Sequence, residues 1–120
     1  MTKQQLEENY ILKNHTPENL RLLGFHRYSL MCDEDSSYYI YRFPVEKYLG
    51  AVVLECELKI DSNTGNIRVD VYDMDHDVFT MFYNNPTEAN KGFLSRINKI
   101  IVNEYEKLGI VKKSKENKEE

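Results

Sequence analysis

Apolar and polar residues alternate regularly through residues 52–72, and the alternation is interrupted once. The apolar positions of the first arm are Val52, Leu54, Cys56, Leu58 and Ile60, and those of the second arm are Ile67, Val69 and Val71. Between the arms lies the turn sequence Asn63-Thr64-Gly65. A period of two residues is typical of an antiparallel strand with one buried face. The segment therefore predicts a β-hairpin whose second face is polar.

Turn and capping signals predict further elements on the N-terminal side of this hairpin. Thr16 is a suitable N-cap, Pro17 suits the first helical position, and Gly24 suits the end of a short helix. A weaker apolar pattern predicts another helix within residues 2–13. Further strands are expected over residues 25–32, 38–43 and 78–83. We expect Pro44 to end the strand that precedes it.

The longest predicted helix follows Pro86 and Thr87. Its apolar side chains recur three and four positions apart from Phe93 to Leu108, and Gly109 is a suitable C-terminal cap. We expect this apolar stripe to cover one face of the sheet. The predicted fold class is α+β: a single domain with an antiparallel meander sheet of about five strands, a long C-terminal helix packed on one face, and one or two short N-terminal helices.

Length and charge limit the domain count and the classes of partner. The chain of 120 residues is long enough for one domain with its own core, which we assign to residues 1–111. Residues 112–120 are charged and lack apolar side chains, so they predict a disordered tail. The net charge is −4, and outside the tail no basic stripe is present, so we do not expect direct nucleic-acid binding. No apolar run reaches the roughly 18 residues that a membrane span needs, and no signal segment begins the chain, which together predict a cytoplasmic protein.

Two residue groups suggest metal or cysteine chemistry without completing a motif. The run from Asp73 to Asp77 resembles the start of an EF-hand loop, but Val78 replaces the required Gly and Asn84 replaces the closing Glu. We interpret the run as a turn and predict no metal and no cofactor. The remaining candidates are the cysteines with a histidine base: Cys32 and Cys56, with His15, His26 or His76. A buried Cys56 and a Cys32 beside acidic residues would both disfavour the thiolate, so we predict neither cysteine catalysis nor a disulfide.

The polar face of the hairpin contains the residue types of a metal-dependent nuclease. Glu55, Glu57 and Lys59 share one face of the first arm, and Asp70 lies on the second arm. In the PD-(D/E)xK nuclease core, which this short pattern resembles, acidic residues hold a divalent cation and the Lys positions the attacking water. An alternating charged face is also what any exposed hairpin presents. The nuclease is therefore the alternative hypothesis.

Tyrosines are concentrated in the predicted strands, and the chain contains no Trp. The strand over residues 38–43 has aromatic residues on both faces, so we expect Tyr41, and Tyr38 or Tyr39, to be exposed. Exposed tyrosines beside carboxylates are typical of a protein-binding surface. The ordinary preference of Tyr for strands explains the same pattern without any partner. The predicted binding surface consists of Tyr39, Tyr41, Glu55, Glu57, Asp70 and Tyr72.

Several short phrases resemble those of small proteins carried by bacterial phages and mobile elements. They are Tyr41-Arg42-Phe43-Pro44, Leu54-Glu55-Cys56-Glu57-Leu58, Thr64-Gly65, Asp70-Val71-Tyr72-Asp73, Phe82-Tyr83-Asn84 and Leu108-Gly109-Ile110. The resemblance implies a protein that binds and blocks a host protein, including host defence nucleases. The sequence thus predicts a non-catalytic protein-binding module, with the nuclease and a small-ligand-binding protein as alternatives. The partner is not identified, and a homodimer stays open.

Overall fold

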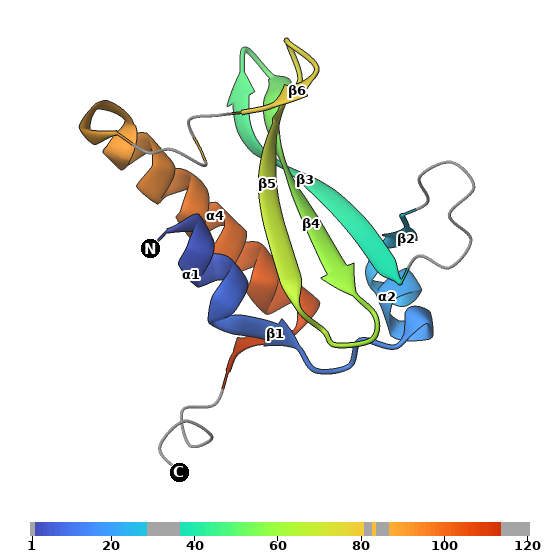
Figure 1. Cartoon of the computed structure of the whole chain (residues 1–120). Coiled ribbons are helices and arrows are strands. Elements are labelled where there is room, and N and C mark those ends of the chain that lie inside the picture. Colours follow the sequence, from blue (N-terminus) through green and yellow to red (C-terminus); the bar gives the residue numbers. More distant parts are fainter. Residues whose placement is uncertain (1, 29–36, 81–82, 84–86, 114–120) are drawn as a thin grey trace.

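The computed structural model describes residues 2–28, 37–80, 83 and 87–113 (Figure 1). Its main sheet has five antiparallel strands in the order β2-β3-β4-β5-β6. The strands are β2 (His26–Arg27), β3 (Tyr38–Tyr48), β4 (Ala51–Asp61), β5 (Ile67–Asp73) and β6 (Val78–Phe79). The predicted α+β class, the meander order and the central hairpin are confirmed.

Strand β3 is longer than the sequence predicts, because Pro44 lies within it. The carbonyl of Tyr38 accepts from Tyr28 N–H on the side away from β4, so even-numbered residues of β3 direct their backbone groups to that side. Strand β2 pairs only with Tyr39 and Ile40, and at Pro44 no strand among the described residues pairs with this side of β3. A proline on an open edge removes no ladder hydrogen bond. The strand therefore continues, with an irregular register between Pro44 and Lys47.

Two of the predicted helices have the expected caps. In α2 (Pro17–Leu23), the Thr16 hydroxyl accepts from Asn19 N–H at 3.2 Å, and Gly24 ends the helix at φ 105°. The C-terminal helix consists of η1 (Glu88–Asn90) and α4 (Lys91–Leu108), which Gly109 ends at φ 81°. Both glycines occupy the left-handed region, where a side chain is costly.

A second, two-stranded sheet joins the two ends of the domain, and the sequence did not predict it. Helix α1 (Lys3–Glu8) is shorter than the predicted segment, and β1 (Tyr10–Leu12) follows it. Strand β1 pairs antiparallel with β7 (Ile110–Lys112), which lies about a hundred residues later. Lys112, predicted as the first residue of the tail, therefore pairs with Tyr10. Three-residue strands carry too little alternation to be recognised from sequence.

The core lies between the main sheet and the helices. We call the side of the sheet that faces the core the inner face and the opposite side the outer face. The inner face and the helices contribute Leu6, Leu20, Phe25, Cys56, Leu58, Ile60, Val69, Val71, Ile97, Ile101 and Tyr105, all almost completely buried. The Tyr105 hydroxyl donates to the Leu6 carbonyl at 3.0 Å and so links α4 to α1, which lie side by side in Figure 1.

Helix α1 also protects the edge of β5. Strand β6 pairs only with Tyr72 and Asp73, which leaves the rest of that edge without a strand partner among the described residues. The Glu7 carboxylate accepts from Val69 N–H at 2.8 Å and pairs with Lys3 at 2.6 Å. A charged side chain at this position blocks the pairing of another strand. None of the described helices is long and apolar enough to span a membrane.

Candidate functional site

The register of the sheet brings the predicted hairpin residues together on the outer face. Glu57 on β4 is aligned with Arg42 on β3 and with Asp70 on β5. Glu55 is aligned with Tyr72, and Lys59 with Arg68. Alternation explains the grouping, because these residues occupy the positions between the buried ones on each strand.

Arg42 is the central cation of the outer face, and the sequence analysis did not identify it. Its Nε and Nη2 atoms donate to Glu57 Oε1 at 3.0 and 2.8 Å. Its guanidinium carbon lies 4.6 Å from the centroid of the Tyr72 ring. Arg42 and Tyr38 are both even-numbered residues of β3 and lie on the same face. Aligning residues 38–43 with the hairpin would therefore have placed Arg42 opposite Glu57. Glu57 is consequently only 7% exposed although it belongs to the polar face.

Lys59 is the second cation held against aromatic rings. Its Nζ atom lies 4.5 Å from the centroid of the Tyr28 ring and 5.7 Å from that of the Tyr38 ring. Such cation–π contacts are worth about 0.5–1 kcal/mol at exposed sites. Tyr38 remains 37% exposed. The outer face thus has two cation–tyrosine clusters, one around Arg42 and one around Lys59.

Tyr39 and Tyr41 lie on the opposite face of the sheet, so the prediction that they form one surface with Glu55, Asp70 and Tyr72 is wrong. They pair with Ile60 and Leu58, whose side chains are in the core, and therefore lie on the inner face. Tyr39 is 4% exposed. The Tyr41 ring stacks on Phe25, and its hydroxyl donates to Glu104 Oε2 at 2.7 Å. This bond, with burial, raises the pKa of Tyr41 to about 12.

The carboxylates of the nuclease hypothesis lie on neighbouring strands, but the central one, Glu57, is paired with an arginine. Burial raises the pKa of Asp70, and the neighbouring carboxylates of Glu7 and Glu57 act in the same direction. The Glu57 carboxylate is already ion-paired with Arg42, whose Nη2 atom lies 2.8 Å from Oε1. Among the described residues, no group of three or more His, Cys, Asp or Glu side chains is arranged to hold a metal ion.

The acidic run at Asp73 forms a turn. The Asp73 carboxylate accepts from the N–H groups of Asp75 and His76, and its second oxygen lies 3.0 Å from His76 Nδ1. The hydrogen bond from His76 lowers the pKa of Asp73 and, reciprocally, raises that of His76. These bonds satisfy the carboxylate within the turn itself, as in an Asx-turn.

The cysteine hypotheses involve one described thiol. Cys56 is completely buried, and burial raises the pKa of its thiol well above the usual value. Cys32 lies outside the described residues. Of the histidines proposed as a base, His15 is bonded through Nδ1 to the Ser62 carbonyl at 2.7 Å. The environment of Cys56 is that of a packed apolar side chain.

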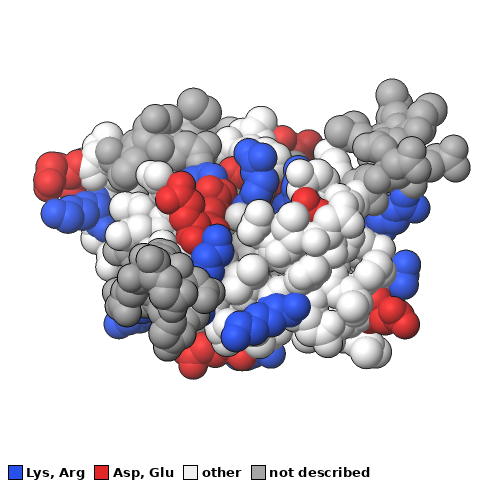
Figure 2. All heavy atoms as spheres, turned by 60° about the horizontal axis from the view of Figure 1, so that its bottom comes forward, with Lys and Arg blue, Asp and Glu red and all other residues white. Residues whose placement is uncertain are grey.

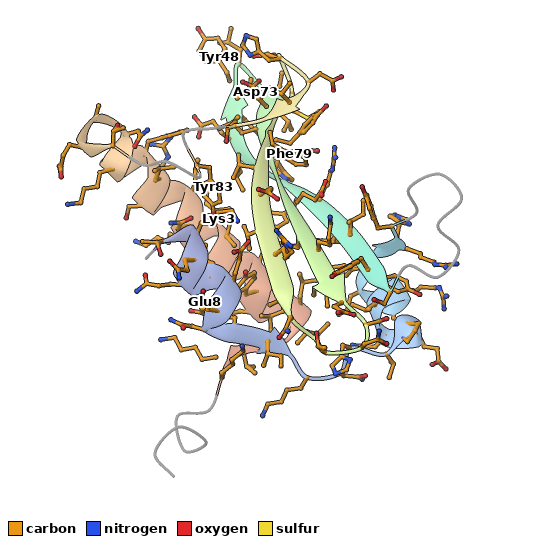
Figure 3. The ribbon with its side chains drawn as sticks, viewed as in Figure 1. Lys3, Glu8, Tyr48, Asp73, Phe79 and Tyr83 are labelled. Carbon is orange, nitrogen blue, oxygen red and sulfur yellow. The ribbon has the colours of Figure 1, made fainter. Side chains whose placement is uncertain are left out.

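A groove of about 920 Å³ lies between α1 and the first half of α4. Lys3, Glu7 and Lys91 line it together with a buried pair in which the Tyr83 hydroxyl donates to Asn98 Oδ1 at 3.1 Å. Figure 3 shows Lys3 and Tyr83 close together beside these helices. The groove is the feature that bears on the small-ligand hypothesis, although residues next to Tyr83 lie outside the described part of the chain.

Charges of both signs are interleaved on the surface that Figure 2 presents. The described Lys and Arg side chains in this view stand singly among acidic and uncharged residues. This distribution differs from the basic stripe that follows a phosphate backbone.

No protein-family model matches the chain, and no curated protein matches it. Among solved structures, the crystal structure of a DUF1831 family protein from Lactobacillus plantarum is similar, with 9% sequence identity and a TM-score of 0.49. The similarity covers 87% of this chain and 86% of that one.

Proposed function

We propose that this protein is a non-catalytic protein-binding module and that its partner docks on the outer face of the sheet. The observation that carries the proposal is the pair of cation–tyrosine clusters, Arg42 on Tyr72 and Lys59 on Tyr28. The described contacts of α2 and α4 with strand β3 involve residues of the inner face, such as Tyr39 and Tyr41. Within the described residues, Tyr38, Arg42 and Arg68 of the outer face are exposed and can meet a partner.

The residue types of the outer face and the fixed orientation of Arg42 both favour a protein as the partner. Arg and Tyr are the side chains that most often dominate the binding energy of protein interfaces. Arg42 is already oriented by Glu57 and Tyr72, so docking would immobilise few new rotamers. Half-buried Glu55 and exposed Arg68 add charges of both signs, which select a partner with a complementary pattern.

A sharper version of the proposal makes the protein an inhibitor of a host protein that itself binds nucleic acid. Its support is the resemblance to phage and mobile-element proteins and the net charge of −4, which suits a basic target. Capture from an extract of the native host, followed by mass spectrometry, identifies the target. A stoichiometric partner with a basic surface is the expected result.

Substitutions on the outer face then test the docking surface itself. Tyr38→Ala and Glu55→Lys should weaken capture of that partner, whereas Glu106→Lys on the exposed side of α4 should not. The Glu55 variant should also change how binding depends on salt, because exposed interface charges act mainly on association. Capture that is equal for all three variants would reject the outer face.

The nuclease is the second candidate, favoured by the alignment of Glu57 with Asp70. Its test uses Mg²⁺ or Mn²⁺ with plasmid, single-stranded DNA and RNA. Asp70→Asn is the variant of choice because it leaves the Arg42–Glu57 pair in place. Cleavage by the native protein that disappears in folded Asp70→Asn would replace the binding-module proposal with an enzyme.

A further inference from the structure

Apolar side chains are exposed together where the β3–β4 turn and the β5–β6 turn meet. Five of the eight large apolar side chains that the described residues expose belong to these turns and their flanks. They are Tyr48, Leu49, Met74, Val78 and Phe79, which we call the hairpin-tip cluster. Figure 3 shows Tyr48 and Phe79 at the same end of the sheet. The start of the β5–β6 turn is tied to strand β4 by a hydrogen bond from Met74 N–H to the Val53 carbonyl at 2.9 Å.

Leu49 is the clearest sign that this exposure is not a by-product of folding. It is 89% exposed and has φ 52°, and it precedes Gly50 at φ 84° in a two-residue hairpin turn. Asn, Asp or Gly are the residues that such a turn favours, because a branched apolar side chain is strained at positive φ. A leucine here benefits neither the turn nor the core. Exposed strain of this kind points to a contact outside the chain.

The hairpin-tip cluster is anchored to the outer face. The Phe79 ring meets the Tyr72 ring edge-on, with centroids 5.5 Å apart. Tyr72 in turn lies under the Arg42 guanidinium, and its hydroxyl donates to the Asp77 carboxylate. The cluster is therefore continuous with the proposed docking surface, and its aromatic members are held in place before any partner arrives.

The charge around the hairpin-tip cluster restricts the partner. Asp73, Asp75 and Asp77 lie in and beside the β5–β6 turn, where His76 is the sole basic residue, and Lys47 beside Tyr48 adds one positive charge, so the acidic residues predominate. A second copy of this chain would bring two acidic turns together, and an anionic membrane would repel the turn. A cationic protein segment with an apolar side fits both the side chains and the charge.

On the basis of the proposed function, we propose that the hairpin-tip cluster inserts into an apolar, lysine- or arginine-rimmed surface of the partner protein. Leu49 is the inserted side chain. The acidic turn pairs with the basic rim.

The test uses a defined probe, a fluorescent amphipathic helical peptide built only from Leu and Lys, with binding measured by anisotropy at physiological salt. Leu49→Asn removes the apolar side chain and suits the turn better, so the variant should fold at least as well. We expect it to weaken peptide binding at least about tenfold. Leu22→Asn is the matched control, since Leu22 on α2 is 84% exposed and lies away from the tip. Asp75→Asn should weaken binding and reduce its salt dependence.

Each contrary result overturns the inference. Native protein that does not bind the peptide, equal binding by Leu49→Asn, or an equal loss in Leu22→Asn rejects the insertion of Leu49. Equal binding of a Ser/Lys peptide rejects the apolar part. Binding to phosphatidylcholine vesicles that Leu49→Asn abolishes assigns the tip to membranes, and a dimer that the same variant dissociates assigns it to a second copy. The outer-face variants Tyr38→Ala and Glu55→Lys, tested with the captured partner, show separately whether the proposed function holds.

Discussion

The inner and outer faces of strands β3, β4 and β5 are formed by alternating residues of the same strands, yet the two faces bury side chains in different ways. The inner face excludes water with apolar side chains such as Leu58 and Val69, each 0% exposed. On the outer face Glu57 is nearly as inaccessible, at 7%, but its carboxylate is paired with Arg42. Burial alone therefore does not identify the core side of this sheet. What separates the faces is whether buried groups need a partner.

The largest effect should come from placing a charge on the inner face. Leu58→Asp buries an unpaired carboxylate and should cost more than about 4 kcal/mol, enough to unfold the domain. Lys59→Asp, one position further on the half-buried outer face, should cost about 1 kcal/mol or less. Circular dichroism and urea denaturation measure both. A folded Leu58→Asp variant would mean that the two faces have been assigned the wrong way round.

Neighbouring tyrosines give the next contrast. Tyr39→Ala removes a ring that is 4% exposed and should destabilise by about 3 kcal/mol. Tyr38→Ala removes a ring that is 37% exposed and should cost about 1 kcal/mol. The difference between the two unfolding free energies is the measurement. Equal values would show that odd- and even-numbered residues of β3 do not lie on opposite faces of the sheet.

A smaller effect is expected where the outer face loses its central cation. Arg42→Met leaves the buried Glu57 carboxylate without a partner and should cost about 2 kcal/mol. Arg96→Met is the control, because Arg96 is bonded to Glu46 at 3.0 Å with 56% of its side chain exposed and should matter little. The two are compared by chemical denaturation. If the Arg96 variant loses as much stability, the burial of Glu57 has no energetic consequence.

The smallest effect concerns the inner-face hydroxyl of Tyr41. Tyr41→Phe removes the hydrogen bond to Glu104 and should cost about 1 kcal/mol near pH 7. The pKa of Tyr41 rises from 10.0 to about 12 on folding, so between these values the native state holds a proton that the unfolded state has lost. Stability contributed by the hydroxyl is thus present below pH 10 and lost as pH rises toward 12.

Alkaline melting curves test the sign of this dependence. The native protein should lose stability with rising pH more steeply than Tyr41→Phe does. Burial raises the pKa values of Tyr83 and Tyr105 as well, but this contribution to the pH dependence is the same in the native protein and in Tyr41→Phe. A steeper loss in Tyr41→Phe would contradict the raised pKa.

Particular residues show why much of the fold was predictable. The caps at Thr16, Gly24 and Gly109 act within one turn of chain, and the alternation along β4 and β5 depends on neighbours two residues away. The hairpin also places Glu55, Glu57, Asp70 and Tyr72 on one face through its own register. These features need no knowledge of distant segments.

The misassigned residues depended on pairing between segments that are far apart. Tyr39 and Tyr41 could be placed only by knowing which side of β3 faces α4, because that strand has aromatic residues at both odd- and even-numbered positions. Arg42 gains its role from an ion pair with a residue 15 positions away. The sequence contains both partners of each contact, but nothing local specifies which of them meet.

Local periodicity and capping chemistry therefore determined the element types, the meander order and the polar face of the central hairpin, since each follows from backbone geometry over a few residues. Only the tertiary structure decided that Pro44 lies on a side of β3 with no strand partner there among the described residues, and that β1 pairs with β7. It also decided that the exposed side chains of Tyr48 and Phe79 lie at one end of the sheet. Those outcomes depend on which surfaces remain unpaired once the whole chain has packed, a property that no short stretch of residues possesses by itself.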